Sequence, residues 1–566
     1  MLPRIPIGID DFRTVREAGL EYVDKSGLIR DLVDRSGVEV VCLPRPRRFG
    51  KTLNLSMVRC WFEKRGEDLS HLFEGLSIWQ AGAEYRAHFQ RYPVIHLSFK
   101  ETKLDRFERV LAALHRKIHV LFREHSYLLD SDRLSERERQ DFRAVLEGTA
   151  TPTLHERALL DLSAYLHAHH GEKVIILVDE YDEPIHAGHV YGYSAEILDF
   201  MGALLGAGLK SNSHLFKAVM TGILRVAKEN LFSGLNNLGV YSLLRRDFHL
   251  HFGFTEPEVA ALLARCGRAE SLPDVRAWYN GYLFGGEVVY NPWSVLCFLD
   301  SSDARVRPYW LSTSSNDLVK QLLERHALTL QPVFEALLEG GNIERRLDEN
   351  VVLSELGRSE DALWSLLVFS GYLKAEEAPD DALGRAVHRL SIPNREVREV
   401  YSSTFAAWMR DRVEGHGGRL SDLTEALLTG DAEVFEEQLQ AFVTDVLSFH
   451  DPGKLHPERV YHGFLVGLLA VLEPGHQVRS NRESGKGRSD VLIRPLRAGS
   501  PGVVLELKVA RPGKKTLDQA LAEGLAQLQS KDYGAELRAV GAAPVHAFAV
   551  AFDGKEVRVR AAGALD

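Results

Sequence analysis

The alternation of apolar and polar positions near the N-terminus predicts a strand, a loop and a helix in succession. Residues 38–43 are apolar, short and rich in β-branched side chains, a pattern that favours a buried parallel strand. After a polar loop, the next apolar positions recur at helical spacing: Leu53, Leu55, Met57 and Val58. We therefore expect a β–loop–α unit over residues 38–58.

Three further apolar runs predict strands of the same sheet. Residues 92–99 form a run that a proline bounds, residues 173–179 end in an aspartate, and residues 216–221 end in a threonine. Parallel strands that pair bring their polar ends to one edge of the sheet, so Thr221 should lie beside Asp179. The pattern predicts an α/β fold with a parallel sheet.

Helical periodicity dominates residues 103–170 and the stretch from about residue 254 to residue 450. The second stretch opens with Thr255 as a predicted N-cap, and Pro257 and Glu258 fall in the first turn. Two of its predicted helical segments are 317–323 and 360–369. We interpret this stretch as a helical lid or transmission region, and a winged-helix element within it is an open alternative.

An aromatic cluster surrounds the N-G-Y and Y-N-P turns of this middle region. Its members are Trp278, Tyr279, Tyr282, Tyr290 and Trp293. Aromatic rings beside basic residues can stack nucleic-acid bases, but core packing is their more frequent use. We favour the core interpretation.

The C-terminal region has a second α/β pattern with charged residues on one strand face. Asp490 opens an apolar run, a Gly-rich turn follows, and residues 503–509 form a second run. Glu506 and Lys508 are two positions apart, so a strand places them on one face, opposite three apolar neighbours. A hairpin would bring Asp490 beside them. The Pro- and Gly-containing segment 450–457 is the expected hinge into this region.

Composition narrows the class of protein. The chain has 566 residues, 45% hydrophobic and 26% charged, which is typical of a globular protein of about three domains. No apolar run approaches the roughly 18 residues of a membrane span, and the N-terminus lacks a signal-peptide core. Four cysteines without C-x-x-C spacing indicate neither a disulfide framework nor a zinc site. We expect a cytoplasmic protein with no membrane partner.

The loop after the first strand has the residues of a phosphate-binding site. Gly50, Lys51 and Thr52 match the end of G-x-x-x-x-G-K-[ST], in which backbone amides and the lysine hold phosphates and the hydroxyl binds Mg²⁺. Arg45 stands at the position of the first glycine. With Arg48 and their neighbours it concentrates cations that favour an anionic ligand. We predict that this loop binds ATP.

The acidic end of the strand 173–179 supplies the expected second half of the ATP site. Asp179 is predicted to hold Mg²⁺ and Glu180 to orient or deprotonate the attacking water. Thr221 is a candidate γ-phosphate sensor. Arg225 follows it with Lys228, either as transition-state cations, in the same chain or a neighbouring copy, or as a solvated helix face. A homo-oligomer is therefore an open alternative.

These motifs resemble those of the AAA-ATPase-like family whose members carry a PD-(D/E)XK nuclease domain at the C-terminus. The stretches that carry the resemblance include R-P-R-R-F-G-K-T, V-D-E-Y-D-E-P, Y-V-D-K-S, W-Y-N-G-Y and E-S-G-K-G-R-S-D followed by E-L-K. The resemblance covers nearly the whole chain, and it implies that an arginine at the first glycine position is usual. It also implies a P-loop ATPase fold and a restriction-endonuclease-like nuclease fold.

For the C-terminal region we predict a Mg²⁺-dependent nuclease centre. Asp490 and Glu506 are the expected metal ligands, Lys508 positions water or stabilises phosphate charge, and Glu458, one helical turn before His462, is a further candidate ligand. Residues 476–515 hold ten Lys or Arg against three Asp or Glu, within a chain of net charge −10, which indicates a local phosphate footprint. The expected DNA contacts are Arg488, Gln527, Lys531 and Tyr533.

The sequence therefore predicts three parts: an AAA-like P-loop ATPase over 1–253, a helical region over 254–450 and a nuclease-like domain over 451–566. The predicted function is an ATPase coupled to a Mg²⁺-dependent nuclease that acts on DNA. Two alternatives remain open. One is a regulatory switch that binds ATP without turnover, and the other is a DNA- or partner-binding scaffold without cleavage.

Overall fold

A computed structural model gives the fold in two compact units, which are described separately: residues 1–322 with 342–398, and residues 323–341 with 399–566. The structure describes the following residues: 3–224, 237–310, 333–334, 336–338, 340–349, 359–381, 383–401, 417–446, 461, 464–465, 468–469, 472, 475–484, 487–510, 515–531 and 533–564.

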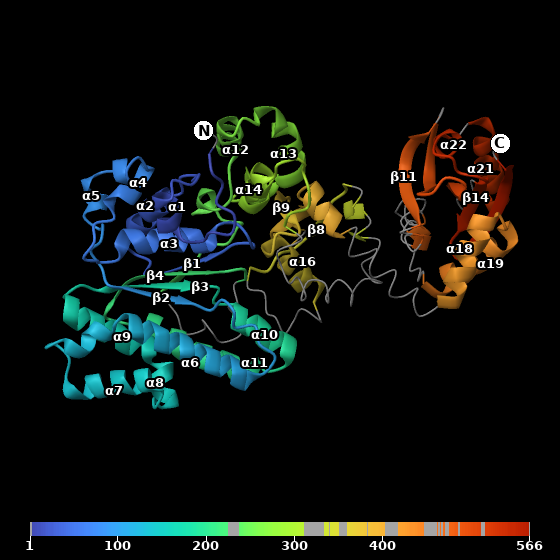
Figure 1. The fold of residues 1–566 in the computed structure, drawn as a ribbon. Helices are drawn as coiled ribbons and strands as arrows, with labels where there is room; N and C mark the ends of the chain where they lie inside the picture. The colour runs from blue at the N-terminus through green and yellow to red at the C-terminus, as the bar shows by residue number, and fades with distance from the viewer. Residues whose placement is uncertain are drawn as a thin grey trace. The chain divides into compact units, whose positions relative to one another are not determined.

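A five-stranded parallel sheet forms the centre of the first unit (Figure 1). Its spatial order is β2-β3-β4-β1-β5. The strands are β1 (Val40–Pro44), β2 (Val94–Ser98), β3 (Val174–Asp179), β4 (Leu215–Gly222) and β5 (Leu238–Val240). This confirms the predicted α/β fold and four predicted strands, whereas β5 was not predicted. In space β4 separates β1 from β3, and β2 lies at one edge.

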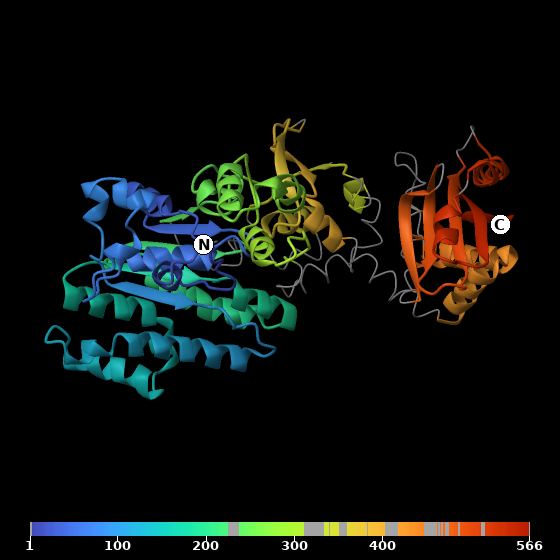
Figure 2. The same cartoon turned by 45° about the horizontal axis from the view of Figure 1, so that its top comes forward.

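Helices cover both faces of this sheet (Figures 1 and 2). One face carries α1 (Phe12–Glu17), α2 (Gly27–Asp34), α3 (Lys51–Phe62), α4 (Ser77–Gln80) and α5 (Ala83–Arg86). The other face carries α6 (Phe107–Glu124), α9 (Ala158–His170), α10 (Glu183–Tyr191) and α11 (Ser194–Leu209). Outside that layer lie α7 (Glu136–Glu147) and α8 (Pro152–Glu156). Because helices cover both faces, β1, β3 and β4 are almost entirely buried, as their continuous apolar runs require.

The same unit continues into a mixed region. Its helices are α12 (Glu256–Arg265), α13 (Leu272–Tyr279), α14 (Pro292–Asp300) and α16 (Glu360–Phe369). Its strands are the hairpin β6 (Tyr282–Phe284) and β7 (Glu287–Val289), and the antiparallel sheet β8 (Ile343–Arg345), β10 (Val387–Ser391) and β9 (Lys374–Ala378). The predicted N-cap at Thr255 and the predicted helix at 360–369 are confirmed. The strands were missed, and segment 317–323 lies outside the described residues.

Three of the five clustered aromatics of this region are core residues. Tyr279, Tyr282 and Tyr290 are fully buried, which confirms the core interpretation for them. Trp278 packs against the same core from a partly buried position. Trp293 instead lies at a cavity wall, where the guanidinium carbon of Arg48 is 4.3 Å from the centroid of its ring.

The second unit contains a five-stranded mixed sheet, in the order β11-β12-β13-β14-β15. The strands are β11 (His476–Ser484), β12 (Gly487–Pro495), β13 (Gly502–Val509), β14 (Val545–Asp553) and β15 (Glu556–Ala564). Only β13 and β14 pair in parallel among these neighbours. One face packs with α18 (Gly417–Thr429) and α19 (Ala432–Val446), and the other with α21 (Leu517–Ser530) and α22 (Ala535–Ala539).

Strand β13 shows the predicted division of its side chains between the two faces. Leu505, Leu507 and Val509 join the core with α18 and α19. Glu506 and Lys508 alternate with them and lie on the α21 side, where Lys508 Cγ is 3.5 Å from the position a Cβ would take at Gly524. The expected hinge at 450–457 lies outside the described residues.

Candidate functional site

A cavity of about 600 Å³ lies in the first unit at the carboxyl end of β1. This is a size typical of a small-molecule site. Polar residues from the loop after β1 and from the turn after β3 line one part of it, among them Arg47, Arg48, Lys51, Thr52, Glu180 and Asp182. Apolar side chains from the N-terminal segment and from the mixed region line another part: Ile9, Val23, Phe254, Trp293, Trp310 and Tyr372.

Lys51 is the first residue of α3, and Gly50 before it adopts the left-handed conformation with φ of 81°. That backbone suits glycine and turns the loop into the helix. The Lys51 ammonium donates to the carbonyl oxygens of Arg45 at 3.1 Å and Pro46 at 3.0 Å. Burial lowers the pKa of Lys51, and the carboxylates at the end of β3 and in the turn after it oppose that shift. The loop thus holds a buried cation at a helix N-terminus, where an anion is favoured.

Asp179, the last residue of β3, joins three elements. Its carboxylate is fully buried and accepts from the hydroxyl of Thr52 at 2.7 Å and from that of Thr221 at 2.5 Å. Thr52 belongs to α3 and Thr221 to β4. The expectation that Thr221 lies beside Asp179 is therefore confirmed. Two hydroxyls and a carboxylate form a set of oxygen atoms of the kind that Mg²⁺ binds.

Glu180 follows Asp179 and has the positive φ of 52°. A glutamate rarely adopts this conformation, and such residues cluster at functional sites. Its carboxyl group lines the cavity. Burial, together with a hydrogen bond from Glu183, raises the pKa of Glu180 to about 7, while Lys51 acts in the opposite direction. A carboxyl group with a pKa near neutrality is suited to proton transfer at physiological pH.

Arg45 has a structural role that differs from the expected contact with nucleotide. Its side chain is fully buried and donates to the carbonyls of Pro44 at 2.8 Å and Tyr241 at 2.7 Å. The guanidinium also lies 5.0 Å from the ring of Phe252. Burial lowers the pKa of Arg45 to about 9. Arg45 does not line the cavity, because its side chain fills the space behind the loop.

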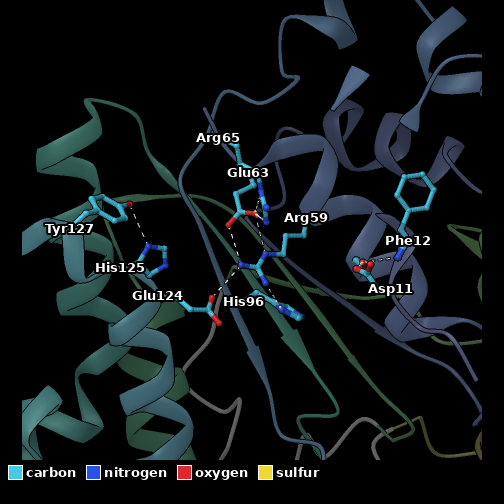
Figure 3. A network of polar contacts seen from close by, with 10 residues as sticks. Asp11, Phe12, Arg59, Glu63, Arg65, His96, Glu124, His125 and Tyr127 are labelled. Carbon is cyan, nitrogen blue, oxygen red and sulfur yellow. Dashed lines mark hydrogen bonds and ion pairs between the residues drawn. The ribbon is translucent and has the colours of Figure 1, made fainter. Parts of the chain in front are cut away.

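Helix α3, which carries Lys51 and Thr52, is fixed at its far end by a polar network (Figure 3). Arg59 bonds to Glu63 and Glu124 at 3.2 Å each and lies 3.4 Å from Nδ1 of His96. Glu124 belongs to α6 and His96 to β2, so one guanidinium connects the helix to both.

Sequence reasoning missed a connection between the N-terminal segment and α12. The ammonium of Lys25 donates to both oxygens of Glu258, at 2.7 and 2.8 Å, and to the carbonyl of Leu250 at 2.9 Å. Lys25 also lines the cavity. Asp24 accepts from the backbone amides of Ser26 and Ser77 at 2.8 Å each. The available signal was the Y-V-D-K-S stretch, in which a charged pair directly follows the apolar Val23.

The second unit brings three predicted residues together at β12 and β13. Asp490 accepts from the backbone amide of Leu507 at 2.8 Å, and Lys508 donates to Glu506 Oε1 at 2.8 Å. Glu506 is 1% exposed and Lys508 9%. Burial and the nearby charge of Asp490 raise the pKa of Glu506 to about 7, and Lys508 opposes this.

The other oxygen of Glu506 supports a cation site. Oε2 is buried and has no hydrogen-bond partner among the residues that the structure describes. An unsatisfied buried carboxylate oxygen beside a second carboxylate is a costly arrangement that a divalent cation would satisfy. Within the described ranges no cluster of three His, Cys, Asp or Glu ligands occurs. The fourth predicted residue of this site, Glu458, lies outside those ranges, as does His462.

The expected DNA contacts differ in where the structure places them. Gln527 donates to the hydroxyl of Tyr533 at 2.9 Å, and the ammonium of Lys531 is 5.9 Å from that ring. Tyr533 is fully buried in the core beneath α21. Its ring is therefore not accessible to DNA, contrary to the expectation. Arg488 pairs with Glu483 in the β11–β12 register, and its side chain is not described. Arg225 and Lys228 also fall outside the described residues.

The fold and the two acidic centres define an ATPase-like α/β unit and a nuclease-like α/β unit. Comparison with protein families identifies both domains. A family described as "Predicted AAA-ATPase" matches residues 6–232, and the PD-(D/E)XK nuclease superfamily matches residues 456–562. The chain therefore carries a predicted AAA-ATPase domain and a C-terminal PD-(D/E)XK nuclease domain.

A relative matches along nearly the full length. It is a protein of Azotobacter chroococcum mcd 1 named "Uncharacterized protein in vnfD 5'region", 29% identical over 558 residues, which cover 97% of this chain and 96% of that protein. The alignment therefore spans both regions that the family models match. Among the described helices, none has the length and hydropathy required to cross a bilayer.

Proposed function

We propose that this protein binds and hydrolyses ATP in its first unit and cleaves DNA phosphodiester bonds with Mg²⁺ in its second. The observation that carries the first part is the convergence of four residues: Lys51, Thr52 and Glu180 line the cavity, and the buried Asp179 accepts the hydroxyl hydrogen of Thr52. The second part rests on Asp490, Glu506 and Lys508 at neighbouring strands. ATP turnover is proposed to control the cleavage.

At the first centre the basic and the acidic residues have different proposed roles. The start of α3 and Lys51 bind phosphate oxygens, and the lysine exchanges its two loop carbonyl partners for them. Thr52 and Asp179 would hold Mg²⁺, which neutralises phosphate charge when bound. Glu180 accepts a proton from the attacking water, for which its pKa of about 7 is suitable. Thr221 orients the carboxylate of Asp179.

The apolar wall of the same cavity suits the base of a nucleotide. Trp293, Phe254 and Tyr372 are aromatic residues of that lining. Aromatic rings stack on nucleobases with little dependence on sequence. ATP as the ligand is therefore supported by both kinds of lining residue, charged and aromatic.

At the second centre Asp490 and Glu506 would hold Mg²⁺, which polarises a phosphodiester and activates water when bound. Lys508 lies beside Glu506 and stabilises the charge that develops on the phosphate. DNA is proposed as substrate because residues 476–515 have a local excess of seven positive charges, ten Lys or Arg against three Asp or Glu. The four cysteines are free, which supports a reducing, cytoplasmic compartment as part of the proposal.

The first half of the proposal is tested by nucleotide binding and phosphate release, comparing wild type with Lys51→Ala. Lys64→Ala, an exposed lysine shortly after α3, serves as the matched control. We expect nucleotide affinity to be lost in Lys51→Ala and retained in the control. Equal binding by all three proteins would exclude the assigned site.

The second half is tested by cleavage of plasmid and linear DNA with Mg²⁺ or Mn²⁺, comparing wild type with Asp490→Ala. We expect metal-dependent cleavage that Asp490→Ala lacks. Cleavage that persists in Asp490→Ala would place the nuclease centre elsewhere. DNA binding without cleavage under any metal would favour the scaffold instead.

A further inference from the structure

The turn after β3 and the end of β4 are held together by a group of hydrogen bonds, which we name the β3–β4 clamp. Thr221 Oγ1 donates to Asp179, Tyr181 N donates to the carbonyl of Thr221 at 3.2 Å, and the Tyr181 hydroxyl donates to the carbonyl of Leu224. One oxygen of Asp182 accepts two further backbone amides, from Ile223 at 2.8 Å and Leu224 at 3.0 Å. The clamp thus joins residues 179–182 to residues 221–224.

The clamp leaves no room for a side chain at Gly222. A Cβ there would lie 2.6 Å from Asp182 Oδ1 and 2.8 Å from Tyr181 Cε1. Tyr181 is fully buried and Asp182 is 3% exposed. The positive φ of Glu180 turns the chain so that Tyr181 and Asp182 reach the end of β4. Close packing and backbone strain therefore coincide at this point.

The acceptor of these two amides is the buried carboxylate of Asp182, although a neutral side chain could accept the same two hydrogen bonds. Burying a charge costs more than burying an amide or a hydroxyl. Asp182 also lines the cavity, as Lys51 does, so its carboxylate lies at the proposed nucleotide site. This links the clamp to the phosphate-binding lysine as well as to Thr221.

We propose that Tyr181 and Asp182 are positioning residues of the ATPase centre. They hold the end of β4 against the turn that carries Glu180, so that the Glu180 carboxylate and the Thr221 hydroxyl keep their places relative to Asp179. This proposal rests on the proposed ATP hydrolysis. Neither residue is assigned contact with the reacting atoms. Their loss should reduce turnover more than nucleotide binding.

The most informative variant is Tyr181→Phe, which removes one hydroxyl from a buried ring of the same shape. Tyr193→Phe is the matched control, since the Tyr193 hydroxyl also donates to a backbone carbonyl, that of Leu104 at 2.6 Å, from a buried position outside the cavity. We expect Tyr181→Phe to lower kcat about tenfold with the nucleotide Kd unchanged. The control should leave both at wild-type values.

Asp182 is tested with two variants. Asp182→Asn keeps a carbonyl oxygen that can accept both amides, whereas Asp182→Ala removes it. We expect kcat to fall about 100-fold in Asp182→Ala and to recover in part in Asp182→Asn, with thermal melts confirming that each variant folds. Wild-type kcat in both Tyr181→Phe and Asp182→Ala would overturn the proposal.

A second readout separates failure of the clamp from failure of the proposed hydrolysis. If the wild type binds ATP without turnover, the hydrolysis proposal fails, and the clamp is then judged by amide exchange at Ile223 and Leu224. A non-hydrolysable ATP analogue should slow that exchange in wild type and in Tyr193→Phe, but not in Tyr181→Phe. Exchange that does not respond to the analogue in wild type would overturn the clamp as a positioning device.

Discussion

Two buried carboxylates, Asp179 at the end of β3 and Glu506 in the interior of β13, are satisfied in different ways. Asp179 accepts a hydroxyl hydrogen on each oxygen, from Thr52 and Thr221. Glu506 accepts from Lys508 on one oxygen, while the other has no partner in the described part of the chain. Protein donors therefore satisfy both oxygens of Asp179, whereas Glu506 has an unsatisfied oxygen that the proposed cation would bind.

The difference predicts different dependence on ligands. The hydroxyls around Asp179 hold its geometry before nucleotide arrives, so the first centre should keep its arrangement in the absence of metal. The second centre combines a raised pKa at Glu506 with an unsatisfied oxygen, so its carboxylate should be fully ionised only when a cation binds or the pH rises. The following changes test that contrast, beginning with the largest expected effect.

Replacing the lysine of the second centre should abolish cleavage. In Lys508→Ala the phosphate loses its charge partner, and we expect DNA cleavage to fall by about 10²–10³-fold or more. Lys555→Ala, at an exposed turn between β14 and β15, is the control and should cleave normally. A gel-based cleavage assay measures both, and ATP hydrolysis should be unaffected in each.

Replacing the proposed base of the first centre should separate binding from turnover. Glu180→Gln keeps the shape of the side chain but cannot accept a proton, so phosphate release should fall by about 10²–10³-fold while fluorescent-nucleotide binding persists. Glu196→Gln, on an exposed face of α11, should match wild type. Unchanged phosphate release in Glu180→Gln would instead support another base.

The two hydroxyls on Asp179 should differ in their effect. Thr52→Val removes a proposed metal ligand and should weaken Mg²⁺-dependent nucleotide binding about tenfold. Thr221→Val should leave binding nearly intact and lower kcat several-fold, because it frees one oxygen of Asp179. Nucleotide-binding titrations with and without EDTA distinguish the two variants. If both variants weaken nucleotide binding equally, or both lower kcat equally, the two hydroxyls do not have the different roles proposed here.

The smallest expected effect is on the pH dependence of stability at the second centre. The unfolded Glu506 carboxyl releases its proton near its ordinary pKa of 4.5, whereas the folded one holds it to about 7. Between these values the folded state binds more protons, so its stability should fall as pH rises. In EDTA, the melting temperature should drop by a few degrees from pH 5 to pH 8, and Glu506→Gln should lessen that drop. An identical drop in the variant would remove Glu506 as its source.

Local sequence patterns were sufficient to predict several strands and the placement of some site residues. Apolar runs gave β1, β3 and β4, and parallel pairing then placed Thr221 beside Asp179. Period-2 alternation placed Glu506 and Lys508 on one face of β13. These inferences hold because they depend on neighbours in sequence or on one strand pairing.

Features set by distant packing were not predictable. Arg45 is buried against carbonyls nearly 200 residues away, Tyr241 among them, which no local pattern reveals. The Lys25–Glu258 pair and the burial of Tyr533 likewise depend on tertiary contacts. The short strand β5 and the sheet of β8, β9 and β10 have weak apolar alternation, so pairing rather than propensity determines them.

The central claim is that one chain contains a nucleotide centre and a separate cleavage centre. The most direct test is cleavage of plasmid DNA with Mg²⁺, with and without ATP, by wild type, Lys51→Ala and Lys508→Ala. We predict cleavage by wild type that responds to ATP, a loss of that response in Lys51→Ala, and no cleavage by Lys508→Ala. Cleavage by Lys508→Ala at the wild-type rate would contradict the assigned cleavage centre.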